Sequence, residues 1–236
     1  MEFWNQFSSG KKRRRIEESG NMRTIKQDIE LLKANYQNIS TIWDGKDCVL
    51  ELKKADFQWR QMEWIGFYFE FISCKLLNND FDFPGEKFGN VGFDLKGAIN
   101  WDLKAKAIKS DSNSCILNDK IAMDESIGKN GFHGEIIALC DVEYNDIDRS
   151  FQNWHDELKG EKSKYVIERE QRTAISRFRK TKAVVAEILF LVIREKDLEN
   201  LSINHQGRNS NGLPRNVKYM LDLENIGEIE RYKISF

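Results

Sequence analysis

One stretch decides how this chain is interpreted, residues 91–107, with the sequence Val-Gly-Phe-Asp-Leu-Lys-Gly-Ala-Ile-Asn-Trp-Asp-Leu-Lys-Ala-Lys-Ala. The pattern predicts two short strands joined by a tight turn, with Asp94 on the first strand and Asp102 and Lys104 on the second. Because side chains alternate along a strand, Asp102 and Lys104 share one face, and the apolar Trp101 takes the other. Two carboxylates a strand apart form a hard oxygen site suited to Mg²⁺. A lysine beside that site can position or deprotonate a water, or stabilise negative charge on a phosphate.

The spacing Asp94, seven residues, Asp102-Leu103-Lys104 resembles the signature of the PD-(D/E)xK nucleases, the superfamily of most type II restriction endonucleases. Two positions differ from the family pattern, because Val-Gly-Phe stands before Asp94 where proline is frequent, and the second acid is Asp rather than Glu. The resemblance implies an α/β fold with a restriction-endonuclease-like core, a mixed central β-sheet flanked by helices. It also implies that Asp94 and Asp102 bind Mg²⁺ with the scissile phosphate, while Lys104 orients the attacking water.

The family's order of elements requires a helix before the motif, and one is expected at 57–77. Apolar residues recur there at helical spacing, and a second row carries Glu63, Gly66 and Glu70. In the resembling family an acid on this helix often reaches the metal. We assign that role to Glu70, with Glu63 as the alternative, although Glu70 can equally be a partly exposed glutamate on a core helix.

A second match to the motif lies earlier in the chain. Asp44, Glu51 and Lys53 satisfy a similar spacing, and a short strand is expected at 47–53. A helix is expected at 22–38, but none suitable for the motif is expected before this match. We therefore rank this match below the motif at Asp94.

The elements after the motif complete a mixed sheet. We expect an irregular insertion at 110–132, a strand at 134–143, a buried central strand at 183–193 and a last strand at 217–223. Asp141 and Glu143 could form a further acidic site or simply face solvent. The histidines, at 133, 155 and 205, each stand alone, which favours surface or structural roles.

Two segments are candidates for contact with DNA. Basic residues far outnumber acidic ones between 162 and 182, and a helix there would carry a basic ridge along the phosphates, or a solvated face balanced by acids elsewhere. The loop 204–216 has no acidic residue and is dense in Gln, Asn and Arg, which pair with base edges. The candidate DNA-binding residues are Lys106, Arg169, Arg172, Arg179, Gln206, Arg208, Asn209, Asn211 and Arg215.

Composition sets the remaining limits. The chain has 236 residues, 40% of them hydrophobic, and a formal net charge of −1, so any basic surface must come from local segregation of charge. We expect a flexible basic tail at 1–20, either solvated or touching phosphates, and a single domain at 21–236. No apolar run suits a transmembrane helix and no signal peptide is evident. Four cysteines without CxxC spacing indicate free buried thiols and a cytoplasmic location.

These observations lead to a hypothesis of function. The chain is expected to be a Mg²⁺-dependent endonuclease that hydrolyses phosphodiester bonds in double-stranded DNA, as a type II restriction endonuclease of a restriction-modification system. A symmetric homodimer would present one site to each strand of the duplex. The alternatives are a structure-selective repair or junction nuclease, which needs little base reading, and a non-catalytic DNA-binding protein with an incidental acidic hairpin.

Overall fold

A computed structural model of the chain describes residues 23–84, 92–108, 113–144, 146–162, 164–171, 178–205, 207 and 212–236. The predicted basic tail at 1–20 lies outside these residues. The helices are α2 (Ile25–Tyr36), α3 (Gly45–Lys54), α4 (Trp64–Leu77), α6 (Lys120–Asn130), α7 (Ser150–Lys159), α8 (Lys164–Gln171) and the 3₁₀ helix η1 (Glu195–Asn200). The strands are β1 (Ile42–Asp44), β2 (Leu95–Lys96), β3 (Asn100–Ala107), β4 (Ser114–Asp119), β5 (His133–Glu143), β6 (Lys182–Ile193), β7 (Ser202–Asn204), β8 (Lys218–Asp222) and β9 (Glu230–Ser235).

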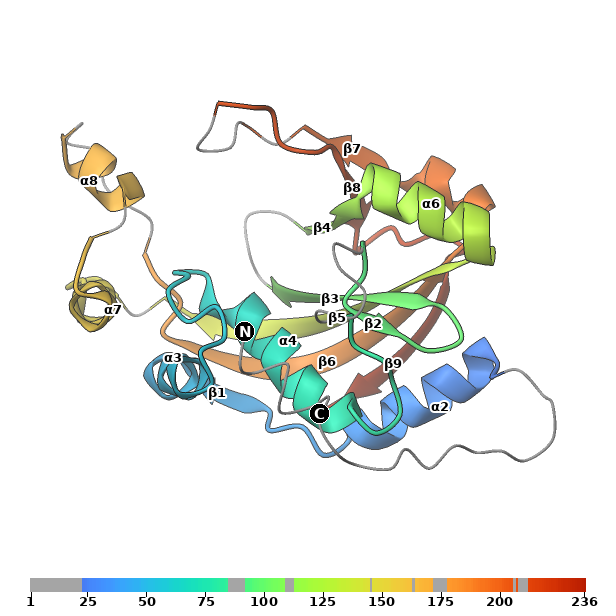
Figure 1. The fold of residues 1–236 in the computed structure, drawn as a ribbon, viewed down its shortest axis with the longest axis horizontal. Helices are drawn as coiled ribbons and strands as arrows, with labels where there is room; N and C mark the ends of the chain where they lie inside the picture. The colour runs from blue at the N-terminus through green and yellow to red at the C-terminus, as the bar shows by residue number, and fades with distance from the viewer. Residues whose placement is uncertain are drawn as a thin grey trace.

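The main sheet is mixed, which confirms the predicted α/β class. Its strand order is β1-β6-β5-β3-β2, and β9 also pairs with β6. Strands β3 and β5 run parallel, whereas the other pairs are antiparallel. In Figure 1 the sheet is curled, with α2, α3 and α4 on one side and α6 with a second, three-stranded sheet on the other.

Two hydrophobic cores lie on the two faces of the main sheet. The larger packs Tyr36, Trp64 and Phe69 of the helices against the sheet, and the smaller includes Leu117 of β4 and Ile137 of β5. Alternate residues of β6 enter each core between Ile188 and Ile193, so this half of the strand is buried on both faces. That double burial accounts for its almost continuous apolar sequence and confirms the central strand predicted at 183–193.

Residues 47–53 form helix α3, so the strand predicted there is wrong. The side chain of Asp44 accepts hydrogen bonds from the backbone N–H groups of Lys46 (2.9 Å) and Asp47 (3.2 Å), which caps the helix. The apolar Cys48, Val49 and Leu52 are buried along one helical stripe. A stripe of that spacing fits a helix.

The helix predicted at 57–77 begins later, at Trp64. Asp56 and Gln58 have positive φ angles of 51° and 44°, a left-handed conformation that a right-handed helix cannot contain. The turns that precede Trp64 therefore separate α3 from α4. Helix α2, in contrast, confirms the helix predicted at 22–38.

The insertion predicted as irregular at 110–132 contains β4 and α6. In β4, Cys115 and Leu117 are buried and Ile116 between them is exposed, as expected for a strand with one covered face. The strand predicted at 217–223 is β8, but it pairs with β4 and β7 in the second sheet rather than returning to the main one. The C-terminal strand β9 was not predicted.

The helix predicted at 162–182 is also wrong over part of the described residues. Gly160, with φ of 75°, ends α7, and α8 ends at Gln171. Arg179 lies in a non-helical segment that leads into β6, so it does not continue a ridge on α8. The left-handed conformation of Gly160, which glycine adopts at little cost, separates α7 from α8.

Two predictions from composition can be compared with the structure. Cys48, Cys74, Cys115 and Cys140 are all free and buried, as predicted. Within the described ranges, each helix is too short or too polar to cross a membrane.

Candidate functional site

The motif forms the predicted hairpin at one edge of the main sheet. Strands β2 and β3 pair antiparallel, with Leu95 opposite Trp101. Asp94 stands one residue before β2, where its backbone N–H donates to the Trp101 carbonyl (3.0 Å) and its Oδ2 accepts from the backbone N–H of Leu103 (2.7 Å). The charge of Asp102 raises the pKa of Asp94, as expected for two carboxyl groups that lie close together. The two acids of the motif are therefore brought together.

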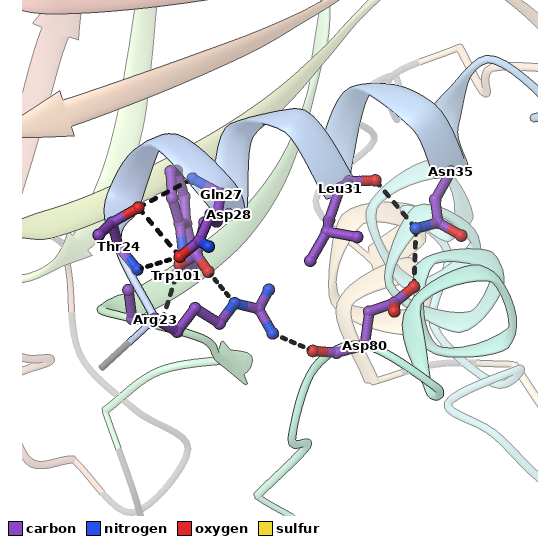
Figure 2. A network of polar contacts seen from close by, with 9 residues as sticks. Arg23, Thr24, Gln27, Asp28, Leu31, Asn35, Asp80 and Trp101 are labelled. Carbon is purple, nitrogen blue, oxygen red and sulfur yellow. Dashed lines mark hydrogen bonds and ion pairs between the residues drawn. The ribbon is translucent and has the colours of Figure 1, made fainter. Parts of the chain in front are cut away.

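Helix α2 anchors the turn of this hairpin through Asp28, whose side chain is fully buried (Figure 2). Its Oδ2 accepts hydrogen bonds from the indole Nε1–H of Trp101 and from the backbone N–H of Ala98, each at 2.9 Å. The guanidinium of Arg23 pairs with its Oδ1. At Gly97 a Cβ atom would lie 2.5 Å from both Asp28 oxygens, so only glycine leaves room for this approach.

The parallel pairing of β3 with β5 adds two residues to the acidic cluster. Asp102 stands opposite Glu135, and Trp101 stands opposite Gly134. A Cβ atom at Gly134 would lie 2.2 Å from the Trp101 indole, so the close packing of these strands requires glycine. His133 lies two residues before Glu135 and shares its face of β5. One potential ligand atom from each of Asp102, His133 and Glu135 lies within 4.8 Å of the others.

Burial and mutual repulsion hold the carboxyl groups toward their protonated forms. Burial, and next the charge of Asp102, raise the pKa of Asp94 to about 8. Burial, and next the charge of Asp94, raise the pKa of Glu70 to about 8. The pKa of Asp102 is raised as well, chiefly by burial, against the attraction of Lys104. A nearby cation would favour the ionised form of all three.

Lys104 is the ammonium group of the cluster. Its Nζ lies 3.2 Å from Asp102 Oδ1, and its side chain is 23% exposed. Burial opposes the charge, but the carboxylates of Asp102, Glu135 and Asp94 outweigh that effect and raise the pKa of Lys104 above its usual range. Lys104 therefore keeps its proton at neutral pH, which suits charge stabilisation rather than proton abstraction.

Of the two candidate helix acids, Glu70 is the one near the motif. Its pKa responds to Asp94 and Lys104, whereas Glu63 precedes α4 and pairs with Lys180 at 2.5 Å. Gly66, one turn before Glu70, lines a small groove of about 150 Å³ between α4 and the end of β3.

The residues of the rival motif have structural roles. Asp44 caps α3, and Glu51 pairs with Lys75 at 2.6 Å. The Lys53 ammonium lies over the ring of Trp59, 4.9 Å from its centroid. The three side chains therefore have separate structural contacts and do not form one acidic site.

The candidate DNA-binding residues are only partly described. Lys106 follows Lys104 on the same face of β3, and Arg215 is exposed in the loop between β7 and β8. Arg179 is only 6% exposed, which does not suit the surface contact with phosphate that we predicted. Arg169 lies in α8, but its side chain is outside the description, as are Arg172, Gln206, Arg208, Asn209 and Asn211 entirely.

Three further residues were not predicted at this site: Asp28, His133 and Glu135. His133 was interpreted as isolated, but it lies beside Glu135, with 3.7 Å between His133 Nε2 and Glu135 Oε1. The available signal was the spacing His-Gly-Glu at the start of a predicted strand, with glycine between two polar residues. On β5, Asp141 and Glu143 are exposed at the other end of the strand and lie outside the cluster of His133 and Glu135.

Comparison with protein-family models, with curated proteins and with solved structures found no significant match for this chain.

Proposed function

We propose that this chain is a Mg²⁺-dependent endonuclease of double-stranded DNA with a restriction-endonuclease-like core, resembling the PD-(D/E)xK superfamily. The observation that carries the proposal is the joining of Asp94, Asp102 and Lys104 on one hairpin. Glu70 and Glu135 add two more carboxyl groups to the surroundings of a single ammonium. An acidic excess of this kind, next to a retained lysine, suits a cation that binds a phosphate.

The donor atoms fit Mg²⁺. Asp94 and Asp102 supply carboxylate oxygens, and Asp102 Oδ2 is buried without a hydrogen-bond partner in the described part of the chain. Glu70 lies close enough for its pKa to depend on Asp94, as an acid at the edge of the site would. When bound, Mg²⁺ would polarise the scissile phosphate and lower the pKa of an attacking water.

The protein groups then have separate tasks. Asp94 and Asp102 hold the cation and, through it, the phosphate. Because Asp94 accepts the Leu103 amide, its carboxyl group is oriented by the same strand that carries Asp102. Lys104, which stays protonated, orients the water by hydrogen bonding and offsets the charge that develops on the phosphate. Lys106, farther along β3, is placed for a neighbouring phosphate.

Sequence recognition and assembly form the finer part of the proposal. The composition of the loop at 204–216 supports base reading, and the two-fold symmetry of a duplex supports a homodimer that acts on a palindrome. Together these features favour a type II restriction endonuclease over a structure-selective nuclease.

The test is cleavage of plasmid DNA with Mg²⁺ by the wild type, Lys104→Ala and the control Lys53→Ala. We expect discrete fragments from the wild type and the control, and loss of cleavage with DNA binding retained in Lys104→Ala. Full activity of Lys104→Ala would contradict the assignment of the site. Nicking confined to junctions or flaps would indicate a repair nuclease, and binding without cleavage would indicate a non-catalytic protein.

A further inference from the structure

The cluster of Asp102, His133 and Glu135 contains a buried imidazole that the proposed magnesium chemistry does not use. His133 and Glu135 are 0% exposed, and Asp102 is 3% exposed. His133 begins β5 and Glu135 follows on the same face, directly opposite Asp102 on β3. The backbone pairing of two central strands therefore fixes the relative positions of the three side chains.

Four polar atoms of this cluster have no hydrogen-bond partner among the residues that the structure describes. They are both ring nitrogens of His133, Oε2 of Glu135 and Oδ2 of Asp102. Buried polar groups are hydrogen bonded in the great majority of cases, since an unpaired one costs about 1–3 kcal/mol. Three neighbouring residues with unpaired, buried polar atoms point to a shared bound ion to which these atoms donate electron pairs.

The remaining contacts orient these atoms for such a ligand. Lys104 Nζ lies near Asp102 Oδ1 at 3.2 Å, which leaves Oδ2 as the available oxygen of that carboxylate. The backbone N–H of Asn118 donates to Glu135 Oε1 at 3.4 Å, which leaves Oε2 in the same way. Each carboxylate thus has one oxygen engaged and one free, an arrangement typical of metal ligands supported by outer contacts.

We propose that Asp102, His133 and Glu135 bind a divalent transition-metal ion such as Zn²⁺. Imidazole nitrogen favours such ions, whereas Mg²⁺ takes oxygen ligands almost exclusively. Ligand atoms of one tetrahedral ion stand about 3.4 Å apart when each bond is about 2.1 Å, so the three atoms, now within 4.8 Å of one another, would approach one another by up to about 1.4 Å on binding. Three protein ligands leave a fourth position for water or for a phosphate oxygen.

This inference does not depend on the proposed nuclease activity, although both sites use Asp102. It predicts metal binding that requires a histidine, a property that the cluster of Asp94, Asp102 and Lys104 would not show by itself. If both proposals hold, Asp102 bridges two neighbouring cations, one bound through oxygen alone and one through oxygen and nitrogen.

The test is titration of the metal-free full chain with Co²⁺, followed by visible absorption, and with Zn²⁺, followed by calorimetry. We expect one histidine-dependent ion per chain in the wild type and at least tenfold weaker binding in His133→Asn. His205→Asn, the same change at an exposed histidine, should bind as the wild type does. Equal binding by His133→Asn and the wild type, or no Zn²⁺ binding at millimolar concentration, would overturn the proposal.

A measurement on the unaltered protein covers the case in which His133→Asn does not fold. Nitrogen-15 spectra of the imidazole rings should show one of the three histidines shifting on addition of Zn²⁺, with the pattern of a directly bound nitrogen. No shift, or a shift of His155 or His205 alone, would refute the site. Asp94→Ala separates the two proposals, since it should abolish cleavage and retain binding of Zn²⁺.

Discussion

The contact between Gly134 and Trp101 permits a quantitative prediction for Gly134→Ala. A Cβ at this position would meet three atoms of the indole at 2.2, 2.4 and 2.7 Å, where ordinary contacts begin near 3.4 Å. The ring would have to move by more than an ångström. It is fully buried and is held by its hydrogen bond to Asp28 at 2.9 Å, so it cannot move without loss.

The expected loss has two parts. Overpacking of a well-filled core costs about 1–3 kcal/mol. Weakening of the hydrogen bond from the indole to the Asp28 carboxylate adds about 1.5–3 kcal/mol, because the acceptor is charged. We therefore expect Gly134→Ala to lower the free energy of unfolding by about 3–5 kcal/mol, a large fraction of the stability of a typical domain.

Urea unfolding followed by tryptophan fluorescence measures this loss. The matched control is Gly128→Ala, the same change at an exposed position of α6 where a Cβ would meet nothing within 4 Å. Alanine favours a helix interior over glycine by about 1 kcal/mol, so the control should be neutral or stabilising. A Gly134→Ala protein within about 0.5 kcal/mol of the wild type would refute the packing argument, since neutral surface changes fall in that range.

Three further predictions concern the site and its surroundings. Since the folded pKa of Glu70 is raised to about 8, the folded protein without metal keeps a proton that the unfolded chain releases above about pH 4.5, and its stability falls as pH rises toward 8. Glu70→Gln removes this pH dependence. In EDTA, the melting temperature of the variant relative to that of the wild type should therefore rise from pH 5 to pH 8. If the difference between the two melting temperatures does not change with pH, the burial of the Glu70 carboxyl group is contradicted. Asp28→Ala should cost about 3–5 kcal/mol in urea unfolding, because it leaves Arg23 and the Trp101 indole without their acceptor, and a loss below 1 kcal/mol would show that the hairpin does not depend on α2. Arg215→Ala should lower the discrimination between DNA sequences in the proposed cleavage by about 1–3 kcal/mol per lost base contact, which mapping of the fragments measures. Fragment maps identical to those of the wild type would exclude Arg215 from base reading.

Local patterns in the sequence were sufficient to predict the hairpin. Alternation between Trp101, Asp102, Leu103 and Lys104 identifies a strand with two different faces, and Asp94 lies within the reach of a tight turn. The apolar run at 183–193 similarly identifies a strand buried on both faces. These features depend on residues a few positions apart, which sequence periodicity records directly.

The rest of the site depends on pairing between distant segments. Glu135 joins the cluster because β5 lies parallel to β3 with Glu135 opposite Asp102, and a shift of one residue would send its side chain to the other face. Nothing in residues 133–135 specifies that register by itself. The role of Asp28 could not be predicted either, because an acid in the first turn of a helix is usually solvated and interacts favourably with the helix dipole.

Residues 47–53 show a different limit. Seven residues with apolar positions at Val49 and Leu52 fit a strand or a helix, and the decisive signal lies outside the window, in the cap formed by Asp44. The insertion at 110–132 was misjudged for a related reason. Its polar residues suggested a loop, but Cys115, Leu117 and Met123 are buried against β5 and β6, which the sequence alone does not place nearby.

The anchoring of the hairpin by Asp28 limits how this protein can be dissected. A fragment that begins after α2 would retain Asp94, Asp102 and Lys104 but would leave the indole N–H of Trp101 without its acceptor. Grafting the hairpin onto another scaffold would transfer the acids without the carboxylate that secures their turn. Helix α2 and the hairpin should accordingly open together in hydrogen exchange, as one cooperative unit assembled from segments some seventy residues apart along the chain.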